Sequence, residues 1–174
     1  GVNGGVGAGT EEGSLPATAG GGYAQLVSTL KNLYGRIEIT DKAVRASRND
    51  EGAFIDLLNT EMEQLLRSSS FNFGRMLFGD GTGRLGKVGT VSGNTYTLDS
   101  VKNFAVGMIV DLYNDEDALV SAGHTVTGVN YSKKQITLTG TAQLDAVGGN
   151  IYMQNSRNLE ITGLGAIFSD STEL

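Results

Sequence analysis

The sequence predicts an α+β chain in which one long amphipathic helix precedes a small all-β domain. Two observations support this class: apolar residues follow helical spacing over residues 48–78, and short alternating stretches fill residues 88–155. At 174 residues the chain can hold one ordinary domain, or one domain with a modest insertion. We therefore expect a helical part followed by a small β domain.

Residues 1–22 are rich in glycine and contain Glu11 and Glu12 but no lysine or arginine. Such a stretch buries too little apolar surface to offset the entropy of ordering it. It is therefore either a disordered tail or an extended arm that orders against a neighbouring subunit. In the second case we expect Glu11 and Glu12 to meet basic residues of that neighbour.

Residues 23–46 alternate polar and apolar positions on both sides of Gly35. This period of two predicts a β-strand with one bulge. We expect this strand and the following helix to form one unit, residues 23–87.

The long helix is predicted from about Asp50 to Phe78, a length of roughly 40 Å. Its apolar stripe is too wide for the local sequence to cover, so a partner surface is expected. The candidate subunit contacts on this stripe are Phe54, Leu58, Met62 and Leu65.

A weak point interrupts this helix at Ser68, Ser69 and Ser70, with Gly74 following. Together these residues cost about 2 kcal/mol of helix propensity relative to alanine. We interpret them as a hinge at which the helix can bend.

Residues 88–155 carry the signals of a small barrel or sandwich. A hairpin is expected around Gly93-Asn94 and a second around residues 132–134. Further strands are expected at residues 104–113 and 150–154, with an acidic loop at residues 114–117.

Composition argues against several kinds of function. The net charge is −6 with no evident Lys/Arg cluster, which disfavours direct DNA binding. No cysteine is present, and no apolar run approaches the roughly 20 residues of a membrane span. We expect no metal, no cofactor and no membrane partner.

A phosphate-loop pattern, one histidine and an acidic stretch each suggest a functional site, but none has the neighbouring sequence that such a site requires. Residues 81–87 match two phosphate-loop patterns, but a helix precedes them and strands follow, the reverse of a phosphate site. His124 is expected in a surface loop without a partner. Asp111 and residues 115–117 lack the spacing of a calcium loop and are expected in a solvated acidic turn. No enzyme is predicted.

The order of these pieces resembles the major capsid proteins of tailed phages with the Hong Kong 97 fold. The resemblance rests on the segment LYGRIEIT at residues 33–40, on the helix end MLFGDGTG at residues 76–83, and on LEITGLGAIF at residues 159–168. It implies an extended loop at residues 1–22, a spine helix at residues 48–78, and an inserted β domain at residues 88–155. Residues 156–174 would lead toward an axial domain, so a fragment of a longer protein is expected.

The resemblance implies a structural protein that self-assembles into the icosahedral head shell of a phage, built in the bacterial cytoplasm around DNA that it does not bind specifically. Its partners would be copies of itself in hexamers and pentamers, and also scaffolding or decoration proteins. Some members cross-link subunits through a lysine of the extended loop. Residues 1–30 hold no lysine, so this chemistry does not transfer.

Two alternatives remain open at this point. An encapsulin-like shell of a bacterial compartment would share the fold and differ in its cargo. A carbohydrate-binding module of a phage tail or adhesin would instead show aromatic side chains on one sheet face.

Overall fold

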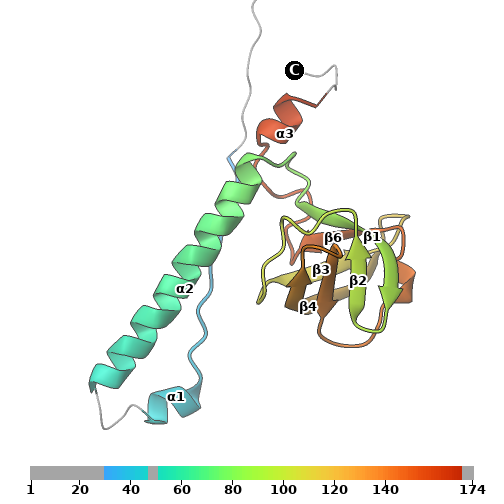
Figure 1. The fold of residues 1–174 in the computed structure, drawn as a ribbon. Coiled ribbons are helices and arrows are strands. Elements are labelled where there is room, and N and C mark those ends of the chain that lie inside the picture. Colours follow the sequence, from blue (N-terminus) through green and yellow to red (C-terminus); the bar gives the residue numbers. More distant parts are fainter. Residues whose placement is uncertain (1–29, 47–50, 170–174) are drawn as a thin grey trace, which may run out of the picture. The chain divides into compact units, whose positions relative to one another are not determined.

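The computed structural model describes residues 30–46 and 51–169. It contains two α-helices before a six-stranded barrel and one short helix after it, which confirms the α+β class (Figure 1). Glu11 and Glu12 lie outside the described residues.

The strand expected over residues 23–46 is wrong for the part that the structure describes. Residues 30–40 have no strand partner among the described residues, and α1 (Asp41–Ala46) is a helix. The helix is closed by a hydrogen bond from Val44 N to Thr40 O at 3.1 Å and by an ion pair between Arg45 and Asp41, four residues apart. Local helical bonds therefore outweigh the weak alternation of polar and apolar residues.

The long helix is confirmed as α2 (Glu51–Leu77), 27 residues without interruption. It continues unbroken through Ser68–Ser70 and Gly74 (Figure 1). The hinge itself stays a prediction.

The β domain is a closed barrel with strand order β1-β2-β5-β4-β3-β6. All of its pairs are antiparallel, and irregular register in four of them provides the bends that let a small sheet close on itself. The strands are β1 (Arg84–Ser92), β2 (Thr95–Leu98), β3 (Ile109–Tyr113), β4 (Leu119–Asn130), β5 (Gln135–Leu138) and β6 (Asn150–Met153).

Both expected hairpins are confirmed. Ser92 pairs with Thr95 across a two-residue turn in which Gly93 has a φ of +54°, and Asn130 pairs with Gln135 across the second turn. A 3₁₀ turn, η1 (Leu144–Ala146), lies between β5 and β6, and α3 (Leu164–Ile167) follows the barrel.

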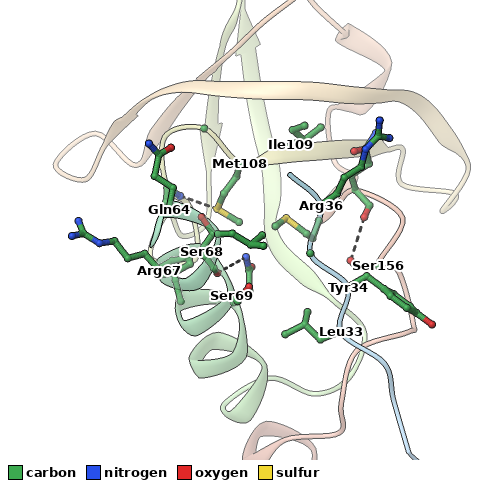
Figure 2. Close-up of a pocket in the computed structure, with 18 of the residues that line it drawn as sticks. Leu33, Tyr34, Arg36, Gln64, Arg67, Ser68, Ser69, Met108, Ile109 and Ser156 are labelled. Atoms are coloured by element: carbon green, nitrogen blue, oxygen red, sulfur yellow. Dashed lines mark hydrogen bonds between the residues drawn. The ribbon is translucent and has the colours of Figure 1, made fainter. Parts of the chain in front are cut away.

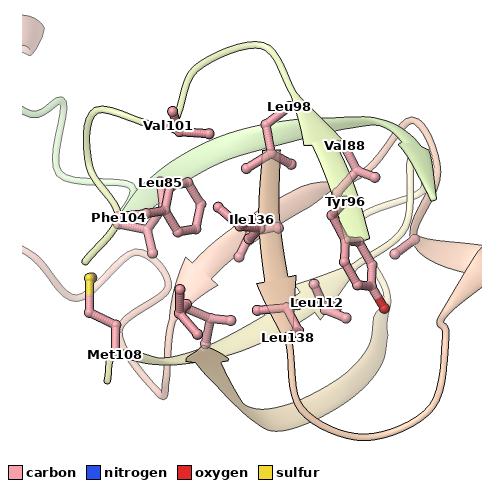
Figure 3. Packing of buried hydrophobic residues seen from close by; sticks show 14 residues of the cluster. Leu85, Val88, Tyr96, Leu98, Val101, Phe104, Met108, Leu112, Ile136 and Leu138 are labelled. Atoms are coloured by element: carbon pink, nitrogen blue, oxygen red, sulfur yellow. The ribbon is translucent and has the colours of Figure 1, made fainter. Parts of the chain in front are cut away.

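The hydrophobic core lies inside the barrel (Figure 3). Inward positions of all six strands fill it, together with side chains from the loop between β2 and β3 and from η1. Its buried members are Leu85, Val88, Tyr96, Leu98, Val101, Phe104, Met108, Val110, Leu112, Val126, Ile136, Leu138, Ala146 and Ile151.

The chain enters and leaves the barrel at neighbouring positions. Arg84, the first residue of β1, pairs with Tyr152 of β6. Beyond the barrel the two segments stay together, since Asn158 N donates to Thr82 O at 2.8 Å. Gly83 has a φ of +78°, and a Cβ there would lie 2.8 Å from Ser156 O, so a side chain would force the two segments apart.

Candidate subunit-contact surfaces

Helix α2 carries two apolar stripes side by side, and the chain covers only one of them. The covered stripe contains Phe54, Leu58 and Leu65, which are half-buried, and Met76, which is buried. The second stripe lies one position further along the helix and is exposed: Ile55, Met62, Leu66, Phe73 and Leu77. Steps of seven and four residues place these five side chains on one face of the helix.

The four side chains predicted as subunit contacts fall into two groups, one exposed and one partly covered by the chain. Met62 is 54% exposed and belongs to the uncovered stripe. Phe54, Leu58 and Leu65 are partly covered by the chain itself. The prediction passed over Ile55, Leu66, Phe73 and Leu77 as contacts, although their spacing of seven and four residues marks a separate stripe.

The segment before α1 provides part of the cover. A Cβ on Gly35 would lie 2.7 Å from Leu65 Cδ1, so the backbone of this segment passes directly over the helix. Glycine permits this close approach because it has no side chain.

Beside this contact runs an open groove with a volume of about 760 Å³. Figure 2 shows Leu33, Tyr34 and Arg36 on one side, and Gln64, Arg67, Ser68 and Ser69 of α2 on another. Met108 and Ile109 of the barrel and Ser156 complete the labelled lining. The described lining contains Glu61 as its one carboxylate and no histidine.

Two of the proposed hinge residues, Ser68 and Ser69, line this groove. Ser69 is half-buried, whereas Ser68 and Ser70 are exposed. Ser68 O accepts a hydrogen bond from Asn72 Nδ2 at 3.0 Å, one turn further along the helix. A Cβ on Gly74 would meet nothing within 4 Å.

A buried ion pair ties the end of α2 to the segment that leaves the barrel. Arg75 Nη1 donates to Glu160 Oε2 at 2.8 Å, and Arg75 Nη2 donates to the other carboxylate oxygen. The Arg75 and Glu160 side chains are 6% and 3% exposed. This bidentate geometry compensates both charges inside a site that excludes water.

His124 is buried on β4, so its predicted place in a surface loop is wrong. Its Nδ1 lies 2.7 Å from Thr139 O and its Nε2 lies 2.7 Å from Ser121 Oγ. Because a carbonyl can only accept, Nδ1 carries a proton and donates to Thr139 O. The imidazole therefore links β4 to the chain that follows β5, a contact that no local sequence pattern indicates.

Asp111 is also buried rather than part of a solvated turn. Its carboxylate accepts hydrogen bonds from Gly123 N at 3.0 Å and Asn155 N at 2.9 Å. Residues 115–117 are exposed, as expected for an acidic turn. Across residues 30–46 and 51–169, no three side chains of the metal-binding types gather into a site.

Most aromatic side chains of the barrel are buried or half-buried. Tyr96, Phe104 and Tyr152 are buried, Tyr113 is half-buried, and Tyr131 is exposed. The flat aromatic platform expected of a carbohydrate-binding module is therefore absent from the described barrel. Arg157 stacks over Tyr113 with 4.8 Å between the guanidinium carbon and the ring centre, which fastens the exit segment to the barrel wall.

Comparisons of the chain with protein-family models, with curated proteins and with solved structures give no match. Within the described residues, no helix combines the length and the apolar character that crossing a membrane requires.

Proposed function

We propose that this chain is a shell-building part of a tailed-phage major capsid protein with the Hong Kong 97 fold. The observation that carries the proposal is the uncovered stripe Ile55, Met62, Leu66, Phe73 and Leu77 on a 27-residue helix. Contiguous apolar surface of this kind is typical of protein–protein interfaces. Closed shells provide such partners by symmetry, because every copy presents the same surface to its neighbours.

The order of elements supports the same proposal. A long helix, a β domain whose two ends meet, and a returning segment tied to the helix by Arg75 and Glu160 match the expected spine helix, insertion and path toward an axial domain. The acidic composition is consistent with a shell that encloses DNA without adhering to it.

Electron microscopy of the protein expressed from its complete reading frame tests the proposal. Uniform closed particles are expected, and monomers at high concentration would contradict it. The nucleic acid or protein inside the particles distinguishes a phage head from a bacterial compartment shell.

Variants of the exposed stripe sharpen this test. Leu66→Gln and Phe73→Gln should abolish or greatly reduce particle formation, because both side chains are exposed in the chain and the proposed subunit contact would bury them. The matched control is Leu159→Gln, since this side chain is similarly exposed but lies outside both the α2 stripe and the barrel. Unchanged particles from the helix variants would show that this stripe is not a subunit contact.

A further inference from the structure

The two ends of the barrel carry opposite charge. The twelve-residue strand β4 begins beside the turn that joins it to β3 and ends beside the turn that joins it to β5. These two turns therefore lie at opposite ends of the barrel. The first is acidic and the second is basic.

The basic end gathers lysines that are distant in sequence. Lys133 and Lys134 form the β4–β5 turn, and Lys134 O accepts a hydrogen bond from Leu98 N at 2.8 Å. This bond brings the turn beside the loop that follows β2, where Lys102 is exposed. None of the three lysines forms an ion pair with any described residue.

The carboxylate of Asp99 at this end already has an ion-pair partner and hydrogen-bond donors. Asp99 pairs with Arg84 at 3.0 Å and accepts hydrogen bonds from the backbone N–H groups of Lys87 and Ser100. The charge of the three lysines is therefore left uncompensated within the described chain.

The acidic end is built from two segments that touch. Asp115 and Glu116 are exposed in the turn closed by the hydrogen bond from Asn114 N to Ala118 O, and Asp145 is exposed in η1. A Cβ on Gly148 would lie 3.6 Å from Asp115 Cβ, so η1 and the turn are neighbours.

Exposed apolar side chains accompany both charged ends. Tyr131 is 65% exposed next to the lysine turn. Leu119, Leu144 and Val147 are exposed around the acidic end. An apolar centre with charged groups around it is the usual composition of a protein–protein contact.

We infer that the acidic end of one barrel docks on the basic end of the barrel of a second copy, in a head-to-tail contact. Complementary charge on one molecule favours this partner over a nucleic acid, because three lysines offer few phosphate contacts and the acidic end would repel DNA. This inference rests on the proposed function only because a shell would bring many copies of the chain together.

The contact is weak between two free chains. The ends of a six-stranded barrel are too small to bury the roughly 1,200 Å² of a stable interface. Exposed ion pairs also contribute little and are screened by salt. In an assembly, however, other contacts hold the copies at high effective concentration, and each barrel end adds to the whole.

The test is light scattering on the 174-residue chain, with the second virial coefficient measured at about 0.01 M and about 0.15 M ionic strength, where charges are screened over about 30 Å and about 8 Å. A net charge of −6 alone predicts repulsion that weakens as salt is added. Head-to-tail docking predicts the reverse: net attraction at low salt that is lost at the higher salt concentration.

Charge reversal at each end separates docking from net charge. Lys133→Glu with Lys134→Glu, and Asp115→Lys with Glu116→Lys, should each abolish the attraction at low salt. The second pair is decisive because it makes the chain less negative, which by net charge alone would increase self-association. An equimolar mixture of the two variants should recover attraction, since each then presents the end that the other needs.

Matched controls carry the same charge changes on other parts of the chain. Lys31→Glu with Arg67→Glu, and Asp56→Lys with Glu63→Lys, alter exposed residues outside the barrel and should leave the attraction largely intact. Tyr131→Ser should weaken it without any change of charge, whereas Leu159→Ser, at an exposed leucine outside both the barrel and the α2 stripe, should not.

Several results would overturn the inference. These are repulsion of the parent chain at low salt, an equal loss in the control variants, or no recovery in the mixture. Salt-dependent binding of a DNA duplex through the lysine end, without self-association, would assign that end to nucleic acid instead. Because these measurements use free chains, their failure is distinct from a failure of the full-length protein to form shells.

Discussion

At the scale of single residues, the Arg75–Glu160 pair is the most consequential contact outside the barrel. Both side chains are almost fully buried, and Arg75 Nε has no hydrogen-bond partner among the described residues. Removal of one charge would leave the other uncompensated in a site without water.

We therefore expect Glu160→Gln to lower the free energy of unfolding by about 3–5 kcal/mol, as for other broken buried ion pairs. Urea unfolding followed by circular dichroism measures this change. Replacement of both partners, Arg75→Leu with Glu160→Leu, should recover much of the loss. Arg84→Gln, which breaks a half-exposed pair, should cost less than about 1 kcal/mol. Equal effects of the two single variants would contradict the argument.

Asp80 offers a test of local electrostatics at the start of the segment that enters the barrel. Burial raises the pKa of Asp80, but hydrogen bonds from the Thr82 hydroxyl and N–H outweigh this effect and hold the pKa below its ordinary value of 3.8. A lowered pKa in the folded state stabilises the fold above the ordinary value, and this stability is lost as pH falls through the folded-state pKa.

Thr82→Val removes the hydroxyl donor and should raise the pKa of Asp80. Titration of the carboxyl carbon by nuclear magnetic resonance measures the shift. Thr90→Val, an exposed threonine of β1 far from this turn, should leave the titration unchanged. An unaltered Asp80 pKa in the Thr82 variant would show that the hydroxyl is not the cause.

At the scale of elements, α2 combines a smooth helix with a sequence that disfavours one at its centre. Ser68, Ser69 and Ser70 keep the helical path, and Gly74 meets nothing where a Cβ would stand. Capsids of the resembled family change shape as they mature, so this stretch remains our predicted site of bending.

Replacement of all three serines by alanine should stabilise the helix by about 1.5 kcal/mol. Slower amide hydrogen exchange over residues 64–74 would measure the stiffening, and maturation of assembled particles should be impaired. Asn59→Ala on the same helix, away from the serines, serves as the control. Unchanged exchange and unchanged maturation would remove the hinge.

Periodic elements could be predicted from sequence, whereas contacts between distant segments could not. Helix α2 and the two hairpins follow from residue spacing and turn residues. The cover of Leu65 by Gly35 has no periodic signal, because an irregular segment passes the helix there. His124, Asp111 and Arg75 have hydrogen-bond partners 12 to 85 residues away, which a local pattern cannot reveal.

The distribution of charge on the surface could likewise not be predicted from local sequence patterns. No cluster of lysine and arginine stands out along the chain, yet the barrel brings the start of the loop that carries Lys102 beside the turn that carries Lys133 and Lys134. Charge on a surface depends on topology as well as on sequence.

At the scale of the whole molecule, the barrel holds its hydrophobic core within one continuous segment of the chain. Its buried core is drawn entirely from residues 85–151, and none of its fourteen members comes from α2. A core confined to one continuous segment should fold without the rest of the chain.

Residues 80–158 expressed alone should therefore unfold in one cooperative transition, with the same near-ultraviolet circular dichroism as in the longer chain. The reciprocal chain, in which a short glycine linker replaces residues 84–153, should retain less structure, because it would lack the buried hydrophobic core. An unfolded isolated barrel would show that it depends on the helix.

The meeting of the two barrel ends also bears on the order in which the molecule can form. Arg75 and Glu160 are 85 residues apart, so an unfolded intervening chain makes their encounter improbable. Once Arg84 is paired with Tyr152, only the short segments that join this pair to Arg75 and to Glu160 remain free to change conformation. This shortening of the loop lowers the entropic cost of closure by about 1.4 kcal/mol. During synthesis, Arg75 of α2 would therefore remain without its ionic partner until the barrel has closed. The folded barrel would then hold the returning segment close to the end of the helix, where Glu160 can pair with Arg75.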